Sequence, residues 1–242
     1  MNRKLYKFYK WLVVVPVLAV STCVFGLLAM LLCTFMDPKF VGQITGVPWA
    51  KLNSIVTPMR VKILGRENVD PKQSYVICAN HQSQYDIFVL YGQLGIDFKW
   101  VMKAELRSVP FLGAACARLG HIFIDRSDTE KALASINAAK EKIVNGTSVL
   151  FFPEGTRSRD GKLLRFKKGA FTFALDLGLP ILPVTIVGTK DILPTDTLDL
   201  YYGNATMIIH PAIDTSGYDK ENLPDLMSAT REVIEKGLTQ NT

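Results

Sequence analysis

The first forty residues of the chain are dominated by apolar side chains. Residues 11–36 contain no Asp, Glu, Lys or Arg, and four basic residues precede them, at positions 3, 4, 7 and 10. A run of this length can cross a bilayer, and it exceeds the apolar core of a secretory signal peptide. Pro16, Ser21-Thr22 and Gly26 interrupt it. Two interpretations follow: one membrane span, or a hairpin of two short helices embedded in one leaflet.

Beyond residue 58, short apolar runs alternate with segments of helical periodicity. Strands are expected at 61–64, 74–78, 98–103, 121–125, 148–152, 181–187 and 205–209. Helices are expected at 85–93, 111–119, 168–177 and 222–236, and from Ser127 or Asp128 to Val144. Strands that alternate with helices predict an α/β fold, with a mostly parallel central sheet flanked by helices. We expect N-terminal membrane-embedded helices and an amphipathic connection over 1–58, followed by one α/β domain over 59–242.

Polar residues follow several of the predicted strands directly. Asn80, Lys103, Asp125-Arg126 and Glu154 each stand at or just after the carboxyl end of a strand. Because the carboxyl ends of parallel strands share one edge of a sheet, these residues are expected to converge on one site.

The segment Asn80–Asp86 places a histidine and an aspartate five positions apart. On one helix the two side chains would point about 140° apart and could not touch. They can meet if His81 lies in a loop and Asp86 in the first turn of the next helix, with Ser83 as the N-cap. A carboxylate in that place can hold one imidazole nitrogen and leave the other free as a base. The alternative is an aspartate that only caps the helix beside a hydrogen-bonded loop histidine.

A second polar segment, Phe152–Arg157, ends another apolar run. Pro153 cannot continue a central ladder, and Gly155 lets the backbone turn or approach a ligand closely. The planar guanidinium of Arg157 suits a phosphate, and the carboxylate of Glu154 beside it is expected to hold it in place. A solvent-exposed loop ion pair is the alternative.

Taken in order, these segments resemble the glycerolipid acyltransferases, in particular the bacterial 1-acylglycerol-3-phosphate (lysophosphatidate) acyltransferases. The matching blocks are Asn80-His81-x4-Asp86, Gly120–Arg126, Phe152–Arg157 and Leu179–Val184. Leu179 departs from the usual Val or Ile. The resemblance implies transfer of a fatty acyl group from acyl-CoA or acyl carrier protein to lysophosphatidic acid, which yields phosphatidic acid.

The chemistry of this transfer assigns roles to the residues. His81 is expected to take the proton of the attacking hydroxyl, with Asp86 fixing its tautomer, and no acyl-enzyme is expected. Oxyanion donors are expected among the backbone N–H groups after His81. Neither a metal nor a cofactor other than the acyl thioester co-substrate is expected. The predicted substrate-binding residues are Lys103, Arg126, Glu154, Gly155, Thr156 and Arg157. For Lys103 and Arg126, surface ion pairing with Glu105 and Asp125 is the alternative.

The net charge and the cysteines indicate the class of binding partner and the redox compartment of the protein. The formal net charge of +6 suits anionic partners such as phosphates or a membrane surface. Nucleic acid is disfavoured, because no nucleic-acid-binding motif accompanies the charge. The four cysteines, at positions 23, 33, 78 and 116, lie in apolar stretches without metal-ligand spacing and are interpreted as buried thiols of a reducing compartment.

Membrane orientation favours one of the two N-terminal interpretations and leaves the other open. A single span would leave the N-terminus in the cytosol and export the catalytic domain, away from cytosolic acyl thioesters. The hairpin is therefore favoured, with the enzyme on the cytoplasmic side of the inner membrane. Open alternatives are an acyltransferase for another lyso-lipid or glycerol 3-phosphate, an acyl-thioester hydrolase and a non-enzymatic lipid-binding module.

Overall fold

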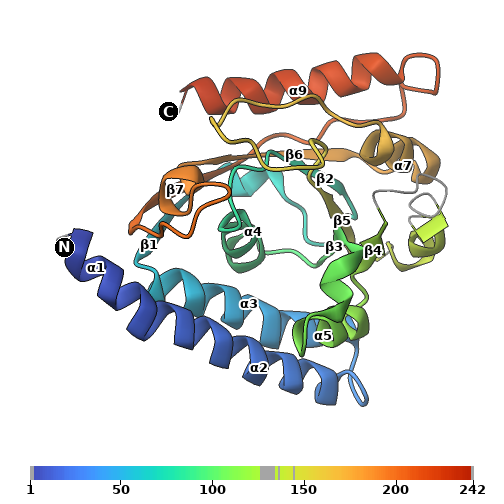
Figure 1. Ribbon diagram of the computed structural model, residues 1–242. Helices are drawn as coiled ribbons and strands as arrows, with labels where there is room; N and C mark the ends of the chain where they lie inside the picture. Colours follow the sequence, from blue (N-terminus) through green and yellow to red (C-terminus); the bar gives the residue numbers. More distant parts are fainter. Residues whose placement is uncertain (1–2, 126–133, 136, 144, 241–242) are drawn as a thin grey trace.

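The apolar N-terminal segment folds as one continuous helix. The computed structural model describes residues 3–125, 134–135, 137–143 and 145–240. Within it, α1 (Arg3–Tyr9), a π-helical turn (Lys10–Val14) and α2 (Val15–Leu32) follow one another without a break, and α3 (Pro38–Val56) returns beside α2 (Figure 1). The prediction that the apolar run is broken into two short helices is therefore wrong. Pro16 is the second residue of α2, close to the π-helical turn, whose i→i+5 hydrogen bonds interrupt the regular α-helical pattern at this place.

The polar residues expected to interrupt this helix join it to α3 instead. The indole nitrogen of Trp49 donates to the Thr22 hydroxyl at 3.1 Å, and the Asn53 amide donates to the Ser21 hydroxyl at 3.1 Å. Residues 37–58, expected as a connection, thus contain a long helix that begins after the N-cap Asp37 and includes Pro48. Residues Leu5–Leu32 form a helix long and apolar enough to cross a membrane, and most of its surface is not covered by the rest of the protein.

Among the described residues, seven strands form one sheet in the order β1-β7-β6-β2-β5-β3-β4. All neighbouring pairs are parallel except β6–β7, which is antiparallel, so the predicted mostly parallel sheet is confirmed. The observed bounds differ from the predicted ones by at most two residues. They are β1 (Met59–Leu64), β2 (Val76–Ala79), β3 (Phe98–Lys103), β4 (Ile122–Ile124), β5 (Ser148–Phe151), β6 (Ile181–Val187) and β7 (Gly203–Ile209).

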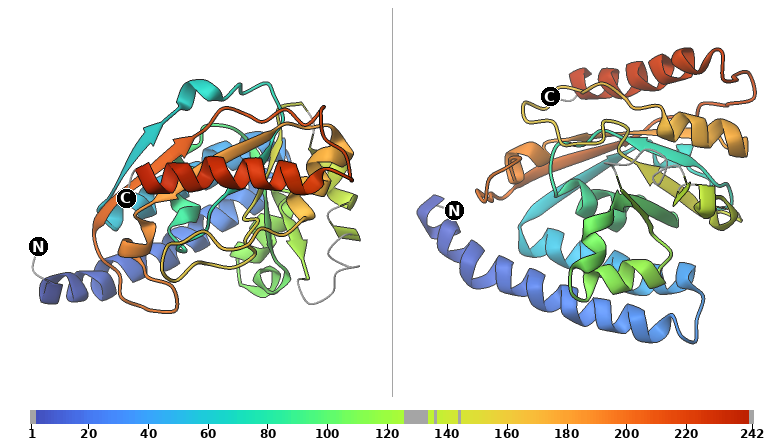
Figure 2. Two further views of the ribbon diagram at one scale, coloured as in Figure 1. Left: turned by 90° about the horizontal axis from the view of Figure 1, so that it is seen from above. Right: turned by 45° about the vertical axis from the view of Figure 1, so that its right-hand side comes forward.

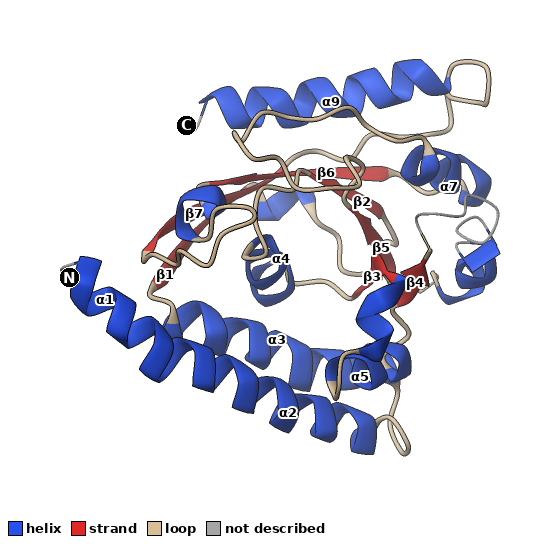
Figure 3. Cartoon of the chain, viewed as in Figure 1, coloured by secondary structure: helices blue, strands red, loops and turns tan. Residues whose placement is uncertain are grey.

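Helices cover both faces of this sheet. On one face lie α7 (Gly169–Leu177) and α9 (Leu223–Gln240); on the other lie α4 (Asp86–Gln93), α5 (Leu112–Arg118) and the α2–α3 pair (Figures 1 and 2). The connections contain the short helices η2 (Arg66–Asn68), η3 (Ala104–Ser108), η4 (Lys140–Lys142) and α8 (Thr189–Ile192). Figure 3 separates the helices, strands and loops of the chain by colour. Of the helix expected from Ser127 or Asp128 to Val144, residues 127–133, 136 and 144 lie outside the described residues, whereas 134–135 and 137–139 are helical as expected.

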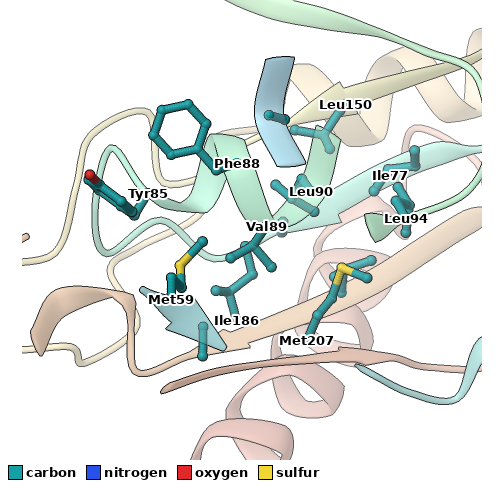
Figure 4. Packing of buried hydrophobic residues seen from close by; sticks show 14 of the residues in the cluster. Met59, Ile77, Tyr85, Phe88, Val89, Leu90, Leu94, Leu150, Ile186 and Met207 are labelled. Carbon is teal, nitrogen blue, oxygen red and sulfur yellow. The ribbon is translucent and has the colours of Figure 1, made fainter. Parts of the chain in front are cut away.

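The central strand β2 shows how the sheet divides two cores. Ile77 belongs to the core under α4, together with Leu90 (Figure 4), whereas Val76 belongs to the core under α7, together with Phe171. All four residues of β2 are buried, as expected for a strand covered on both faces. Burial of each large aliphatic side chain contributes about 1.5–3 kcal/mol.

The four cysteines are free thiols. Cys78 and Cys116 are buried as expected, but Cys23 and Cys33 are only half-buried. Burial raises the pKa of the thiols at 78 and 116, which suppresses the reactive thiolate at these two positions.

Asn80 continues the pairing of β2 with β6 by means of its side chain. Its amide group donates to the carbonyl of Ile186 at 2.9 Å and accepts from the N–H of the same residue at 2.7 Å. Asn80 is buried, so these two bonds fix the point where the chain leaves the sheet and enters the loop at His81.

We expect Asn80→Ala to lower the free energy of unfolding by about 2–4 kcal/mol, because it leaves two buried backbone groups of Ile186 without partners. Urea unfolding in detergent, followed by tryptophan fluorescence, measures the change. Asn204→Ala, at an exposed position of β7, is the matched control and should change stability little. Equal effects of the two substitutions would contradict this account of Asn80.

Candidate active site

His81 and Asp86 are in direct contact at the carboxyl end of β2. The Nδ1 atom of His81 lies 2.7 Å from Oδ2 of Asp86. The aspartate side chain is fully buried, while the imidazole keeps 17% of its surface exposed. As the sequence predicts, the histidine lies in the loop after the strand and the aspartate at the first residue of α4.

The Asp86 carboxylate is surrounded by donors. Its Oδ2 also accepts from the N–H groups of Gln82 at 2.7 Å and Ser83 at 2.9 Å, and its Oδ1 accepts from the hydroxyl of Thr189. An ionised carboxylate is an acceptor only, so Nδ1 of His81 carries the proton in this arrangement. In the neutral imidazole with this tautomer, the Nε2 atom of His81 presents a lone pair, the state needed for a general base.

Two further contacts fix the orientation of His81. Its ring stacks on the ring of Phe152, with centroids 3.8 Å apart and planes 9° from parallel. Its carbonyl accepts from the N–H of Ser158 at 2.8 Å. Both partners belong to the segment around the second polar motif, so the two motifs are packed against each other.

Glu154 supports the backbone of His81 and does not hold Arg157, which corrects the expectation from the sequence. Its Oε1 accepts from the N–H of His81 at 2.7 Å and its Oε2 from the N–H of Leu164 at 2.8 Å. The carboxyl is buried, and burial raises the pKa of Glu154 to about 7 against the opposing effect of these two hydrogen bonds.

Hydrogen bonds to Glu154 and Asp86 occupy three of the backbone N–H groups that were expected to include the oxyanion donors. The N–H groups of His81, Gln82 and Ser83 are all bonded to Glu154 or Asp86, so these three cannot serve an oxyanion. For the N–H of Gln84, the described residues supply no acceptor, and Gln84 lines the cavity beside His81. Ser83 makes the local turn: its hydroxyl accepts from the N–H of Tyr85 at 3.2 Å and donates to the carbonyl of Leu193 at 2.7 Å.

Arg157 and Lys103 line the same cavity as His81. The guanidinium of Arg157 lies 3.9 Å from Asp196, which is too long for a hydrogen bond. The ammonium of Lys103 pairs with Glu105 at 2.8 Å, and both side chains are largely exposed. The ion pair considered as the alternative for Lys103 is therefore present, at a place where the cation also borders the cavity.

The other predicted substrate-binding residues have different positions. Gly155 has φ 73°, and a Cβ atom there would lie 2.8 Å from the Lys167 side chain, so this turn requires glycine. Thr156 is exposed and is not among the residues that line the cavity. Arg126 lies outside the described residues.

The cavity beside His81 is large and mostly apolar. Its volume is about 350 Å³, and its polar border includes His81, Lys103 and Arg157. The apolar lining comes from α2, α3, α4, β3, α5 and the loop at Phe152. An apolar chamber bordered by a base and two cations fits an amphiphile with an anionic head group. Sequence reasoning missed the contributions of α2 and α3, such as Phe25 and Trp49, although the aromatic residues of an apparent connection were a signal.

The described part of the chain has no group of three or more His, Cys, Asp or Glu side chains that could hold a metal ion. His121, for example, is buried with its Nδ1 accepting from the N–H of Trp100 at 3.2 Å. Burial lowers the pKa of His121 to about 3, so this ring is neutral at pH 7.

Comparisons with known proteins show what the chain as a whole is similar to. Residues 60–187 match the family model described as Acyltransferase. The chain is 33% identical over 224 residues to the 1-acyl-sn-glycerol-3-phosphate acyltransferase of Saccharomyces cerevisiae, covering 90% of this chain and 74% of the yeast protein. It is 39% identical over 173 residues to the chloroplastic 1-acyl-sn-glycerol-3-phosphate acyltransferase LPAT1 of Arabidopsis thaliana, covering 71% of this chain and 48% of the plant protein.

A solved structure extends the likeness to the whole fold. The crystal structure of the 1-acyl-sn-glycerophosphate acyltransferase PlsC from Thermotoga maritima superimposes with a TM-score of 0.86 at 28% identity, covering 99% of this chain and 97% of that chain. The plant and algal relatives are longer: the matched part of this chain spans about half their length.

The raised pKa of Glu154 predicts a specific dependence of stability on pH. Because the folded pKa, about 7, exceeds the ordinary value, the native state holds a proton that the unfolded state releases. This stabilisation is present below the ordinary glutamate pKa and is lost as the pH rises through about 7. We expect the free energy of unfolding of the wild type to fall by up to about 3 kcal/mol more than that of Glu154→Gln between pH 5 and pH 7.5.

Urea unfolding at several pH values in this range checks the prediction. Glu67→Gln, at an exposed position in η2, is the control and should keep the wild-type dependence. Parallel curves for the wild type and Glu154→Gln would show that Glu154 does not titrate in this way.

Proposed function

Because this chain belongs to the acyltransferase family, we propose that it transfers a fatty acyl group from an acyl thioester to the free hydroxyl of 1-acylglycerol 3-phosphate, giving phosphatidic acid. One observation carries the proposal: a histidine held by a buried carboxylate borders an apolar cavity that also presents Arg157 and Lys103. The relatives' names identify the same acceptor class.

In the proposed reaction, Nε2 of His81 takes the proton of the acceptor hydroxyl as its oxygen attacks the thioester carbonyl. The C–O bond forms, the tetrahedral intermediate collapses with cleavage of the C–S bond, and the leaving thiolate receives the proton from His81. Asp86 keeps Nδ1 protonated and stabilises the imidazolium between these steps. General acid–base catalysis of this kind contributes about 10²–10⁴-fold to the rate.

A direct transfer is favoured over an acyl-enzyme. The hydroxyl nearest to His81 in sequence, that of Ser83, is fully buried and is committed to Leu193 and Tyr85. It therefore serves the fold of the loop and is not available as a nucleophile. The free N–H of Gln84 is the best candidate for oxyanion stabilisation, since it stands at the cavity between the base and α4.

Arg157 and Lys103 are the proposed ligands of the acceptor phosphate. Arg157 makes no hydrogen bond with Asp196, so its donors remain free for phosphate oxygens. The apolar part of the cavity takes a fatty acyl chain. The acyl donor is acyl-CoA or acyl carrier protein, both of which carry phosphate, and the basic residues of the 159–168 segment offer attraction to either.

The N-terminal helices support attachment to one face of a membrane. The α1–α2 helix contacts the rest of the protein along its length: Tyr6 bonds to the carbonyl of Thr57 at 2.9 Å, Lys10 to that of Leu198 at 2.6 Å, and Trp49 to Thr22. A helix that is hydrogen-bonded to the rest of the protein at several points suits a position within one leaflet better than a separate helix that crosses the bilayer. We propose the cytoplasmic side of the inner membrane, where acyl thioesters are made available.

The test is a transfer assay with a labelled acyl thioester and a panel of lyso-lipids and glycerol 3-phosphate, followed by separation of the products. We expect phosphatidic acid from the wild type, and a loss of at least about 10²-fold in kcat for His81→Ala. Free fatty acid as the main product would identify a hydrolase, and another acylated product would identify a different acceptor.

Arg157→Ala should raise the KM for lysophosphatidate by about tenfold or more, while it leaves the KM for the acyl thioester nearly unchanged, because a phosphate loses its charge-assisted donors. Arg159→Ala is the matched control: this neighbouring arginine is exposed and bonded to Asp196. If both variants change the KM for the acceptor alike, Arg157 is not a specific phosphate ligand.

A further inference from the structure

The segment between β3 and α5 carries an unusual set of exposed apolar side chains. All residues from Glu105 to Phe111 are exposed. Among them, Leu106, Val109 and Phe111 expose 38%, 39% and 39% of their surface, and Pro110 lies between the last two. Water is a poor solvent for such a cluster, so a surface of this kind indicates a partner.

This segment is held rigidly in place. The N–H of Val109 donates to Leu106 at 3.2 Å, and the carbonyl of Val109 accepts from Gly113 at 2.9 Å. Phe111 has φ 61°, a conformation rare for a bulky residue, which persists only when the surroundings impose it. The exposed apolar side chains are therefore a fixed feature of the fold.

This segment packs against α2 at Gly26. A Cβ atom on Gly26 would lie 3.2 Å from the carbonyl oxygen of Phe111, so the two backbones nearly touch there. Figures 1 and 2 show α5 beside α2 from two directions. The neighbouring residues of α2 are exposed and apolar as well, among them Val24, Leu27 and Leu31.

The same two elements enclose the cavity on their inner sides. Phe25, Gly26 and Ala29 of α2 line it, and so do Leu106 and Leu112 at the two ends of the exposed segment. Lys103, which ends β3 just before this segment, lies at its polar border. The junction of α2 with residues 106–111 thus separates the catalytic cavity from an apolar outer surface.

We propose that residues 106–111 insert into the same leaflet as α2, and that this insertion brings the polar border of the cavity at Lys103 to the lysophosphatidate of the bilayer. The inference rests on the proposed function. A lipid bilayer is the occupant because the segment packs against a helix apolar enough for a membrane, and because the cations Lys103 and Arg118 flank the segment. Their charges would lie at the level of the lipid phosphates, and the long side chain of Arg107, within the segment, would extend to the same level.

The experiment compares Val109→Asp with Val109→Leu, since Val109 does not line the cavity. Each protein is bound to vesicles of phosphatidylethanolamine and phosphatidylglycerol. Co-sedimentation measures the bound fraction, and the amount of each variant is adjusted so that equal amounts are bound. Phosphatidate formation is measured with oleoyl lysophosphatidate dissolved in the bilayer and with hexanoyl lysophosphatidate supplied from water. We expect Val109→Asp to lower kcat/KM about tenfold for the oleoyl acceptor, because a charge opposes insertion, and to change it less than about twofold for the hexanoyl acceptor.

Other outcomes overturn the inference in distinguishable ways. An equal loss with both acceptors would assign Val109 a structural role, and no loss with either would show that the segment does not meet the bilayer. A loss with Val109→Leu as large as with Val109→Asp would exclude insertion as the cause. Absence of phosphatidate from the wild type with both acceptors would contradict the proposed function itself.

Discussion

The Asp86 carboxylate organises the catalytic end of the molecule. It accepts hydrogen bonds from one imidazole, two backbone N–H groups and one buried hydroxyl, and it has no exposed surface. A buried carboxylate is tolerated only when donors surround it, and these four donors come from the loop after β2 and from α8. The first turn of α4, the tautomer of His81 and the position of α8 therefore depend on one side chain.

A second carboxylate completes this arrangement from the opposite side. Glu154 binds the N–H of His81, while Asp86 binds its side chain, so the histidine is held at both ends. The two acids accept from the N–H groups of residues 81–83, and His81 borders the cavity. In the proposed reaction, a base fixed in this way loses little entropy when a substrate arrives, which is an advantage for a reaction between two bound molecules.

The cavity explains why the N-terminal helices belong to the catalytic unit. Without α2 and α3, the apolar side of the chamber beside His81 would be open, and an acyl chain would have no wall against which to pack. The same helices present their outer surface to the surroundings with little cover from the protein. In the proposed function, one pair of helices thus serves both the membrane surface and the substrate chamber.

The strands could be predicted because a buried parallel strand is a short apolar run with β-branched residues, whatever its partners are. The meeting of His81 with Asp86 was also predictable, since both lie within one strand–loop–helix unit whose geometry is local. The continuous helix was not, because Pro16, Ser21 and Gly26 break helices on average, whereas the π-helical turn and the contacts with Trp49 and Asn53 accommodate them here.

The features that could not be predicted depend on contacts between residues far apart in the sequence. The sequence by itself determined the order of the strands along the chain and the residue types at the sheet edge. Only the tertiary structure decided that Glu154 bonds to the backbone of His81, that Thr189 bonds to Asp86, and that Arg157 stands near Asp196. The residues of these pairs lie 73, 103 and 39 positions apart in the sequence. At such separations, the packing of the sheet determines which side chains meet, and no local sequence pattern encodes that packing.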